Sequence, residues 1–197
     1  MAPPRVHVIA MLALAENLPG PQALRPGDII RHRNGRTTEV VNTDAEGRLV
    51  MSDAFSFANE EGVDAIIDIA TLTYSTIAAL GLEVTSVLGT DPTLIADIRA
   101  AGGATGDPYW ELPLWEPYRR LIDSPFADLR NEEKEDGPGA ITAGLYLREF
   151  VGDTPWAHLD TGGTAYLDAE TDDVAAGATG VGVRSLVRLI LDRQHAS

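Results

Sequence analysis

The stretch LVMSDAFSFANEEGVDAIIDIATLT (residues 49–73) joins a helix pattern to a strand pattern. Its first part, residues 49–60, has apolar side chains at positions 49, 50, 54, 55, 57 and 58, near the spacing of one helix face, and Gly62 is a typical stop. Its last part, residues 64–73, is β-branched and apolar, as in a strand buried on both faces. The stretch predicts one helix-and-strand unit of a layered protein.

The same alternation continues on both sides of this unit. Asn34-Gly35 is a hairpin signal before it. After it, we predict helices over 93–103 and 139–152, a buried strand over 156–163, and a glycine turn with a closing helix over 177–194. Strands that alternate with helices predict an α/β fold, here a three-layer αβα sandwich with a mixed, mostly parallel central sheet.

An apolar run near the start, VHVIAMLALA (residues 6–15), has two interpretations. Arg5 before the run and small residues at its end are typical of a secretory signal. We favour a buried strand over 6–14, because His7 interrupts the run and the basic region is a single arginine. No stretch reaches the roughly 20 apolar residues that span a bilayer, so we expect no membrane partner.

Charge and cysteine content narrow the function classes. The 197 residues include 15 Lys and Arg against 30 Asp and Glu, a formal charge of −15, which repels nucleic acid and anionic membranes and favours cationic ligands. Cysteine is absent, so any bound metal must use oxygen and nitrogen ligands. The lack of cysteine also points to a reducing compartment, and we expect a cytoplasmic protein that binds no nucleic acid.

Three charged residues alternate in NTDAEGRL (residues 42–49): Asp44, Glu46 and Arg48. In an extended segment they would project to one side, roughly 6.5–7 Å apart. A solvated edge strand is the simple alternative. Carboxylates beside apolar residues suit dications such as Mg²⁺, Mn²⁺ and Zn²⁺, and an arginine there could polarise a carbonyl oxygen. The pattern indicates a candidate metal site.

The segment NTDAEGRL also matches the signature of the leucine aminopeptidase, or cytosol aminopeptidase, family. Further segments resemble that family in the family's order and cover nearly the whole chain. They are RPGDIIRHRNGRTTEV before the signature, and after it ATLT (70–73), GDPYWELPL (106–114), GAITAGLYL (139–147), WAHLD (156–160) and GATGVGVR (177–184).

The resemblance implies a dinuclear metallo-aminopeptidase that removes leucine-type N-terminal residues from peptides, with two Zn or Mn ions, as a cytoplasmic homo-oligomer, by family a hexamer. Asp44 and Glu46 would bind metal, Glu46 as the bridging carboxylate. Arg48 would assist catalysis by holding a bicarbonate-type base and stabilising the tetrahedral intermediate. Thr71 and Leu72 would contact the substrate backbone.

Two departures from the family pattern stand out. The family's other metal ligands, a lysine and two aspartates, and a second catalytic lysine come from a segment before the strand expected at 6–14. Lys134 is the only lysine here, within the charged run 130–136, which we interpret as a solvated loop. Tyr74 stands where the family usually has glycine, and its bulky ring could narrow or fill the cleft. We therefore interpret residues 1–197 as the C-terminal portion of such a catalytic domain, an incomplete or truncated enzyme; the alternative is a non-catalytic binding or assembly module.

Other polar residues have structural interpretations. His158 and Asp160 could be metal ligands, but we favour a buried histidine bonded to backbone. Asp53 is expected to support the start of its helix, and Asp128 and Asn131 to fix a loop. The tryptophans are expected in the core or at an interface: Trp110, Trp115 and Trp156.

Overall fold

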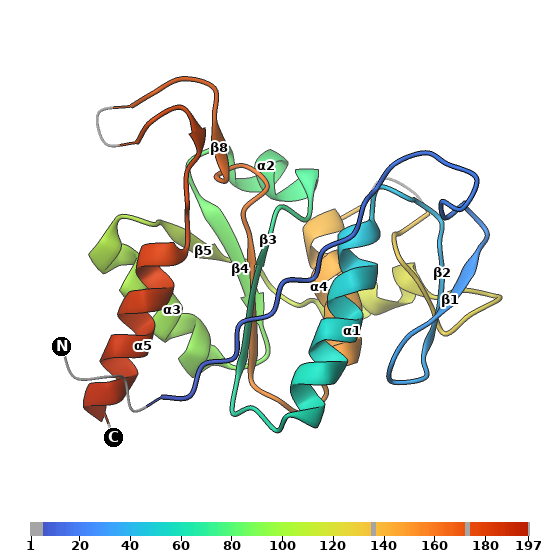
Figure 1. Ribbon diagram of the computed structural model, residues 1–197, viewed down its shortest axis with the longest axis horizontal. Helices are drawn as coiled ribbons and strands as arrows, with labels where there is room; N and C mark the ends of the chain where they lie inside the picture. Colours follow the sequence, from blue (N-terminus) through green and yellow to red (C-terminus); the bar gives the residue numbers. More distant parts are fainter. Residues whose placement is uncertain (1–5, 135–136, 172–173, 197) are drawn as a thin grey trace.

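A four-stranded sheet forms the centre of the computed structural model, which describes residues 6–134, 137–171 and 174–196 (Figure 1). The strand order is β3-β7-β4-β5. Strand β7 pairs parallel with β3 and antiparallel with β4, and β4 pairs parallel with β5. The sheet is thus mixed and mostly parallel. Its strands are β3 (Ile66–Ala70), β7 (Trp156–Asp160), β4 (Thr85–Gly89) and β5 (Tyr109–Glu111).

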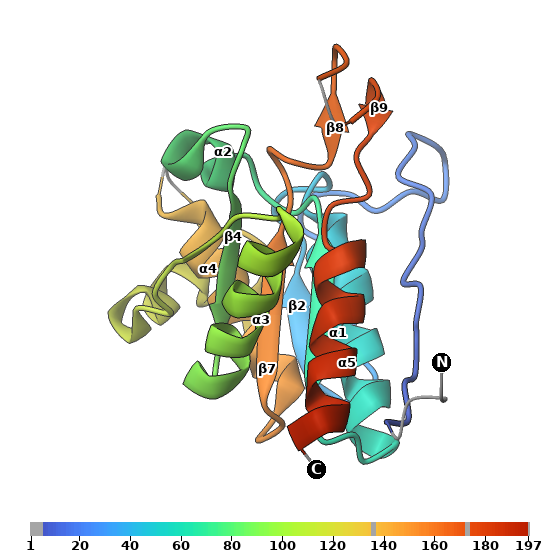
Figure 2. The ribbon, with the colours of Figure 1, turned by 90° about the vertical axis from the view of Figure 1, so that its left-hand side faces the viewer.

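Helices cover both faces of this sheet, which confirms the predicted αβα layers. On one face lie α3 (Pro92–Thr105) and α5 (Val183–Ala196), seen in front of the sheet in Figure 2. On the other lie α1 (Glu46–Glu60) and α4 (Gly139–Val151). Shorter elements complete the chain: α2 (Tyr74–Leu80), the 3₁₀ helix η1 (Glu116–Ile122), and the paired strands β8 (Tyr166–Leu167) and β9 (Gly177–Ala178).

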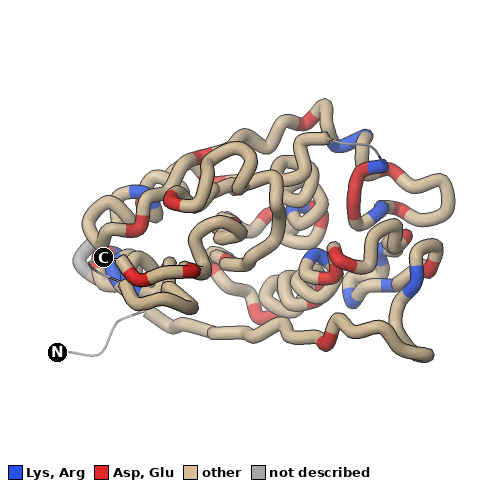
Figure 3. The backbone as a smooth tube through the Cα atoms, turned by 90° about the horizontal axis from the view of Figure 1, so that it is seen from above, with Lys and Arg blue, Asp and Glu red and all other residues tan. Residues whose placement is uncertain are grey.

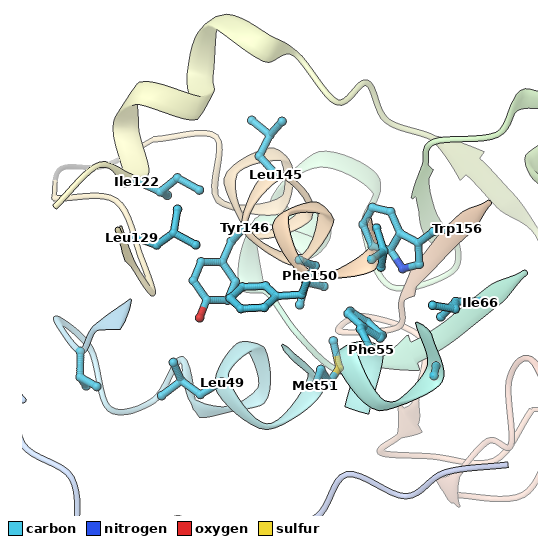
Figure 4. Close-up of a cluster of buried hydrophobic side chains, with 14 residues drawn as sticks. Leu49, Met51, Phe55, Ile66, Ile122, Leu129, Leu145, Tyr146, Phe150 and Trp156 are labelled. Carbon is cyan, nitrogen blue, oxygen red and sulfur yellow. The ribbon is translucent and has the colours of Figure 1, made fainter. Parts of the chain in front are cut away.

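Each face has its own apolar core. Figure 4 shows the larger cluster, in which Phe55 of α1 and Phe150 of α4 pack near Trp156 of β7. The second cluster joins α3 and α5 to the sheet through residues such as Ile98 and Leu189. Every residue of β7 is buried, as expected for a central strand. Of the three tryptophans, Trp156 is therefore a core residue.

A small second sheet, in the order β1-β2-β6, lies beside α1 and α4. It consists of β1 (Ile29–Arg31), β2 (Thr37–Glu39) and β6 (Leu129–Arg130). The hairpin predicted at Asn34-Gly35 is confirmed, with Gly35 at φ 88°. Asp53 fixes this hairpin, since its Oδ1 accepts from the backbone N of Arg33 at 2.9 Å and faces His32 Nδ1 at 3.2 Å. The prediction for Asp53 was wrong because α1 begins at Glu46, two turns earlier.

The strand predicted over residues 6–14 is not formed, and that prediction was wrong. The segment is irregular and mostly exposed, with Leu12 at 85% and Leu14 at 83% exposure. It runs past α1 and β3 (Figure 1) along a groove of about 430 Å³. Apolar composition alone does not make a strand, which also needs paired backbone groups.

The remaining boundaries differ modestly from the predictions. Helix α3 extends to Thr105 and ends at Gly106, which has φ 84°. Strand β3 is shorter than predicted and only partly buried, with Ile69 41% exposed, because it is an edge strand. Acidic positions are distributed over the fold rather than gathered on one face (Figure 3). Among the described residues, no helix is long and apolar enough to cross a membrane.

Candidate active site

A cavity of about 630 Å³ opens where β3 ends and α1 and α2 begin. All five residues predicted for the site line it: Asp44, Glu46, Arg48, Thr71 and Leu72. The first three come from the start of α1 and the other two from the segment after β3, so two separate parts of the chain meet here. The wall also includes residues that we had placed elsewhere or not assigned, namely Asn42, Glu132, Glu133 and Lys134.

The charged triplet is grouped as predicted but not for the predicted reason. The segment is not extended: Glu46 is the first residue of α1, and Arg48 lies within its first turn. Asp44 is exposed, Glu46 is half-buried and Arg48 is buried. The triplet thus spans the start of a helix. Asp44 lies at its exposed end and Arg48 at its buried end, and both line the cavity.

Arg48 is only 3% exposed. One terminal nitrogen donates to the backbone oxygen of Asn131, while Nε has no partner among the described residues. Burial lowers the pKa of Arg48, and the negative charges of Glu133 and Glu132 oppose that shift. The guanidinium group therefore keeps one buried donor, Nε, without a partner among the described residues, and its counter-charges lie on the facing loop.

That loop, residues 130–136, is not simply solvated, and this interpretation was wrong in part. Arg130 and Asn131 are buried, and Glu132 and Glu133 face the cavity; positions 135 and 136 lie outside the described residues. A run of charges suggests solvent exposure, and only the loop's position just before the glycine start of α4 hinted at a pocket wall.

Two polar residues fix this loop, as predicted. Asn131 Oδ1 accepts from the backbone N of Val41 at 2.8 Å, and its Nδ2 donates to the backbone oxygen of Asn42 at 2.6 Å. Asp128 Oδ2 accepts from both the backbone N and Oγ1 of Thr37 at 2.8 Å. These bonds tie the loop to the strand and turn that precede α1, so both charged walls of the cavity are held together.

The carboxylates of Asp44 and Glu46 form no ion pair with any described residue. Their oxygens are therefore available, and their chemistry fits a hard or borderline dication. However, the described residues contain no group of three His, Cys, Asp or Glu placed to hold a metal. The donor type fits a metal, while a complete coordination sphere would need ligands beyond these two.

The segment after β3 is held from below by Asp160. The Asp160 carboxylate accepts from the backbone N of Leu72 at 3.0 Å and from Oγ1 of Thr73 at 2.6 Å. Thr73 in turn caps α2, accepting from the backbone N of Thr76. Asp160 is thus a hydrogen-bond acceptor for the cavity wall, and not a wall residue itself.

His158 is buried as predicted, but its partner is a carboxylate and not backbone. Its Nδ1 lies 2.5 Å from Asp68 Oδ1, and Asp68 Oδ2 accepts from Trp156 Nε1 at 2.7 Å. Burial by itself lowers the pKa of His158, but the charge and hydrogen bond of Asp68, with the charge of Asp160, outweigh it and raise that pKa.

Tyr74 lies on the cavity rim at the first position of α2, and 82% of it is exposed. The ring does not fill the cavity, as a bulky residue could. With Leu72 and Ile77 it forms the apolar part of a wall that is otherwise polar and charged.

This chain is similar to known proteins over almost its whole length. The probable cytosol aminopeptidases of Roseiflexus castenholzii and Geobacter sulfurreducens are 46% and 48% identical over 97% and 94% of this chain. The chain spans about two fifths of their length, 39% and 37%. The solved structure of the bottromycin maturation enzyme BotP superimposes with a TM-score of 0.89 at 38% identity, covering 92% of this chain and 41% of BotP. A second BotP structure, in complex with Mn, gives a TM-score of 0.88.

The family model for the catalytic domain of the cytosol aminopeptidase family matches residues 1–187. That match spans the cavity, the segment after β3 and all four strands of the central sheet. The chain belongs to the cytosol aminopeptidase family.

Proposed function

We propose that this chain provides one part of the active site of a dication-dependent aminopeptidase that removes N-terminal, leucine-type residues from peptides. The observation that carries the proposal is the single cavity that gathers Asp44, Glu46, Arg48, Thr71 and Leu72. Membership in the aminopeptidase family supplies the reaction class. The complete enzyme would need further residues, since this chain corresponds to about two fifths of its relatives.

The charges of the cavity suit the end of a peptide. Four carboxylates line it, those of Asp44, Glu46, Glu132 and Glu133, against the cations of Arg48 and Lys134. A peptide's α-ammonium group would be drawn to the acidic side. Its first side chain would meet the apolar wall formed by Leu72, Tyr74 and Ile77.

Asp44 and Glu46 would hold the metal ions, Zn or Mn, with Glu46 shared between them. Bound dications would polarise the scissile carbonyl group and make water a better nucleophile. The guanidinium group of Arg48, which lines the cavity, would stabilise negative charge that develops on the substrate oxygen. The segment Thr71–Leu72 would orient the substrate backbone, so that binding and chemistry occur at one fixed position.

Membership in the aminopeptidase family also supports proposals about the location, assembly and partners of the complete protein. We expect the complete protein to act in the cytoplasm on peptides, as an assembly of identical subunits, by family a hexamer, and without nucleic acid or membrane partners. The likeness to BotP, a bottromycin maturation enzyme, favours a second candidate function, a role in the maturation of one dedicated precursor.

A chimera tests the proposal. The portion of the Geobacter sulfurreducens relative that matches this chain is replaced by this chain, and hydrolysis of a leucine chromogenic amide is measured with Mn²⁺ or Zn²⁺. We expect activity that Glu46→Gln abolishes and that Arg48→Ala lowers about a hundred- to a thousand-fold in kcat. The conservative exchange Asp192→Asn, on an exposed turn of α5, serves as the control.

The outcome separates the alternatives. Activity on a maturation-type precursor but not on simple amides would favour the second candidate function. A folded, assembled chimera that stays inert even after Tyr74→Gly would refute the enzyme proposal and favour the non-catalytic module.

A further inference from the structure

Beneath the segment after β3 lies a carboxylate that the cavity itself does not contain. Asp160, at the end of β7, is 1% exposed. Its Oδ1 accepts three backbone N–H groups, from Leu72 at 3.0 Å, Gly162 at 3.2 Å and Thr73 at 3.3 Å, while Oδ2 accepts from Thr73 Oγ1 at 2.6 Å. Four donors converge on one side chain, and three of them belong to residues 72–73.

Strand pairing brings this carboxylate to its place. Asp160 pairs with Ala70 in the parallel β3–β7 register, and the backbone N of Thr161 donates to the Ala70 oxygen at 2.8 Å. The chain after β3 therefore leaves the sheet directly over Asp160. Every residue of β7 is buried between the two helix layers, so Asp160 is supported by packing on both faces of the sheet.

Gly162 packs closely against the same segment that Asp160 holds. A Cβ atom on Gly162 would lie 2.5 Å from the backbone oxygen of Thr73 and 3.1 Å from a methyl carbon of Thr76. The backbone of the 161–163 turn thus abuts the start of α2, and a side chain there would push Thr73 outward. Asp160 holds the segment inward, and Gly162 leaves the space for it.

We propose that Asp160, with Gly162, is a positioning residue of the site: it fixes residues 71–73, and through them the cavity wall that contacts the substrate. The inference rests on the proposed function for its catalytic consequence, but its structural part does not. Asp160 contacts neither substrate nor metal in this assignment.

Hydrogen exchange on residues 1–197 tests the structural part. In the wild-type chain the Leu72 and Thr73 amides should be protected by the bonds to Asp160. We expect Asp160→Ala to speed their exchange about tenfold or more, Asp160→Asn to do so less because one acceptor oxygen remains, and Gly162→Ala to act like Asp160→Ala. The matched control is Gly103→Ala in α3, where an added Cβ meets nothing within 4 Å.

Kinetics in the chimera described above test the functional part. Asp160→Asn and Gly162→Ala should raise KM roughly tenfold or more with a smaller change in kcat, because a displaced wall weakens contacts already made in the bound substrate. Gly103→Ala should change neither constant. A purely structural role would instead lower the amount of folded, active enzyme at unchanged KM.

The two experiments distinguish a failure of this inference from a failure of the proposed function. Wild-type exchange rates at Leu72 and Thr73 in a folded Asp160→Asn or Gly162→Ala protein would overturn the inference, as would unchanged KM values in an active chimera. An inactive wild-type chimera would count against the proposed function alone, and the exchange rates would then decide whether Asp160 positions the segment.

Discussion

Replacing Asp68 should reverse how the stability of this protein depends on pH near neutrality. Asp68 has 11% side-chain exposure and pairs with His158, which has 1%. The change to Ala removes the acceptor of two buried N–H groups, His158 Nδ1 and Trp156 Nε1. Each orphaned group costs about 1–3 kcal/mol, and breaking a buried pair costs about 3–5 kcal/mol, so we expect a loss of about 3–5 kcal/mol in the free energy of unfolding.

The sign of the pH dependence follows from the raised pKa of His158. A raised folded-state pKa adds stability that is complete below the unfolded value near 6.5 and is lost as pH rises through the folded value. Without Asp68, burial dominates and the neutral imidazole is favoured, so stability is lost as pH falls below about 6.5. The difference in free energy of unfolding between the wild-type and Asp68→Ala proteins should therefore be largest in acid and shrink above neutral pH.

Urea unfolding followed by circular dichroism from pH 5.5 to 8.5 measures this difference. His32, whose pKa is lowered by burial, is present in both proteins, so its contribution to the pH dependence cancels in the difference. The control Asp192→Asn breaks an exposed pair with Arg188 and should leave the free energy of unfolding nearly unchanged. A difference between wild type and Asp68→Ala that is flat, or that grows with pH, would refute the reasoning.

Three further predictions concern the core, a turn and metal binding. Leu145→Ala, at a fully buried position of α4, should cost about 2–5 kcal/mol in urea unfolding, and a loss below 1 kcal/mol would mean that the site collapses freely. Gly35→Val should destabilise the hairpin by about 1–2 kcal/mol because φ is 88° there, whereas Gly103→Ala should be neutral or stabilising in the same assay. Calorimetry with Mn²⁺ should show only weak binding to residues 1–197, because Asp44 and Glu46 provide two of the four or more ligands that an ion takes; sub-micromolar binding of two ions per chain would contradict this.

Local sequence patterns predicted most of the layers but not every side-chain environment. The α1 and β7 segments can be recognised in the sequence because their apolar residues are spaced so that they face the core that these segments form. Glu132 and Glu133 could not be placed from their own run of charges. Their position depends on bonds that Asn131 makes to residues about 90 positions earlier, and such contacts leave no local signal.

At the start of α1, Asp44, Glu46 and Arg48 lie at one cavity as predicted, although the prediction assumed an extended segment and the structure has a helix. Alternate residues share a side only in a strand, yet Asp44 precedes the helix, and Glu46 and Arg48 lie on its first turn. They meet at one cavity because the chain changes direction at Asn42–Ala45, where Asn42 Oδ1 accepts from the backbone N of Asp44 at 2.9 Å. A signature motif identifies such a turn as a unit, whereas periodicity cannot.

The strand predicted over residues 6–14 was wrong for a different reason. The composition of this run is typical of a strand, but its backbone does not pair with a neighbouring strand. A strand is stable only when its N–H and C=O groups are paired, and β3 is the edge of the sheet beside this run. The run instead passes along the groove between α1 and β3, where Ile69 stays 41% exposed. Apolar composition favours burial of a segment, but the segment forms a strand only when its backbone groups hydrogen-bond in register with another strand. The same distinction explains why a strand predicted over 156–163 does form, as β7 (Trp156–Asp160), which has partners on both sides.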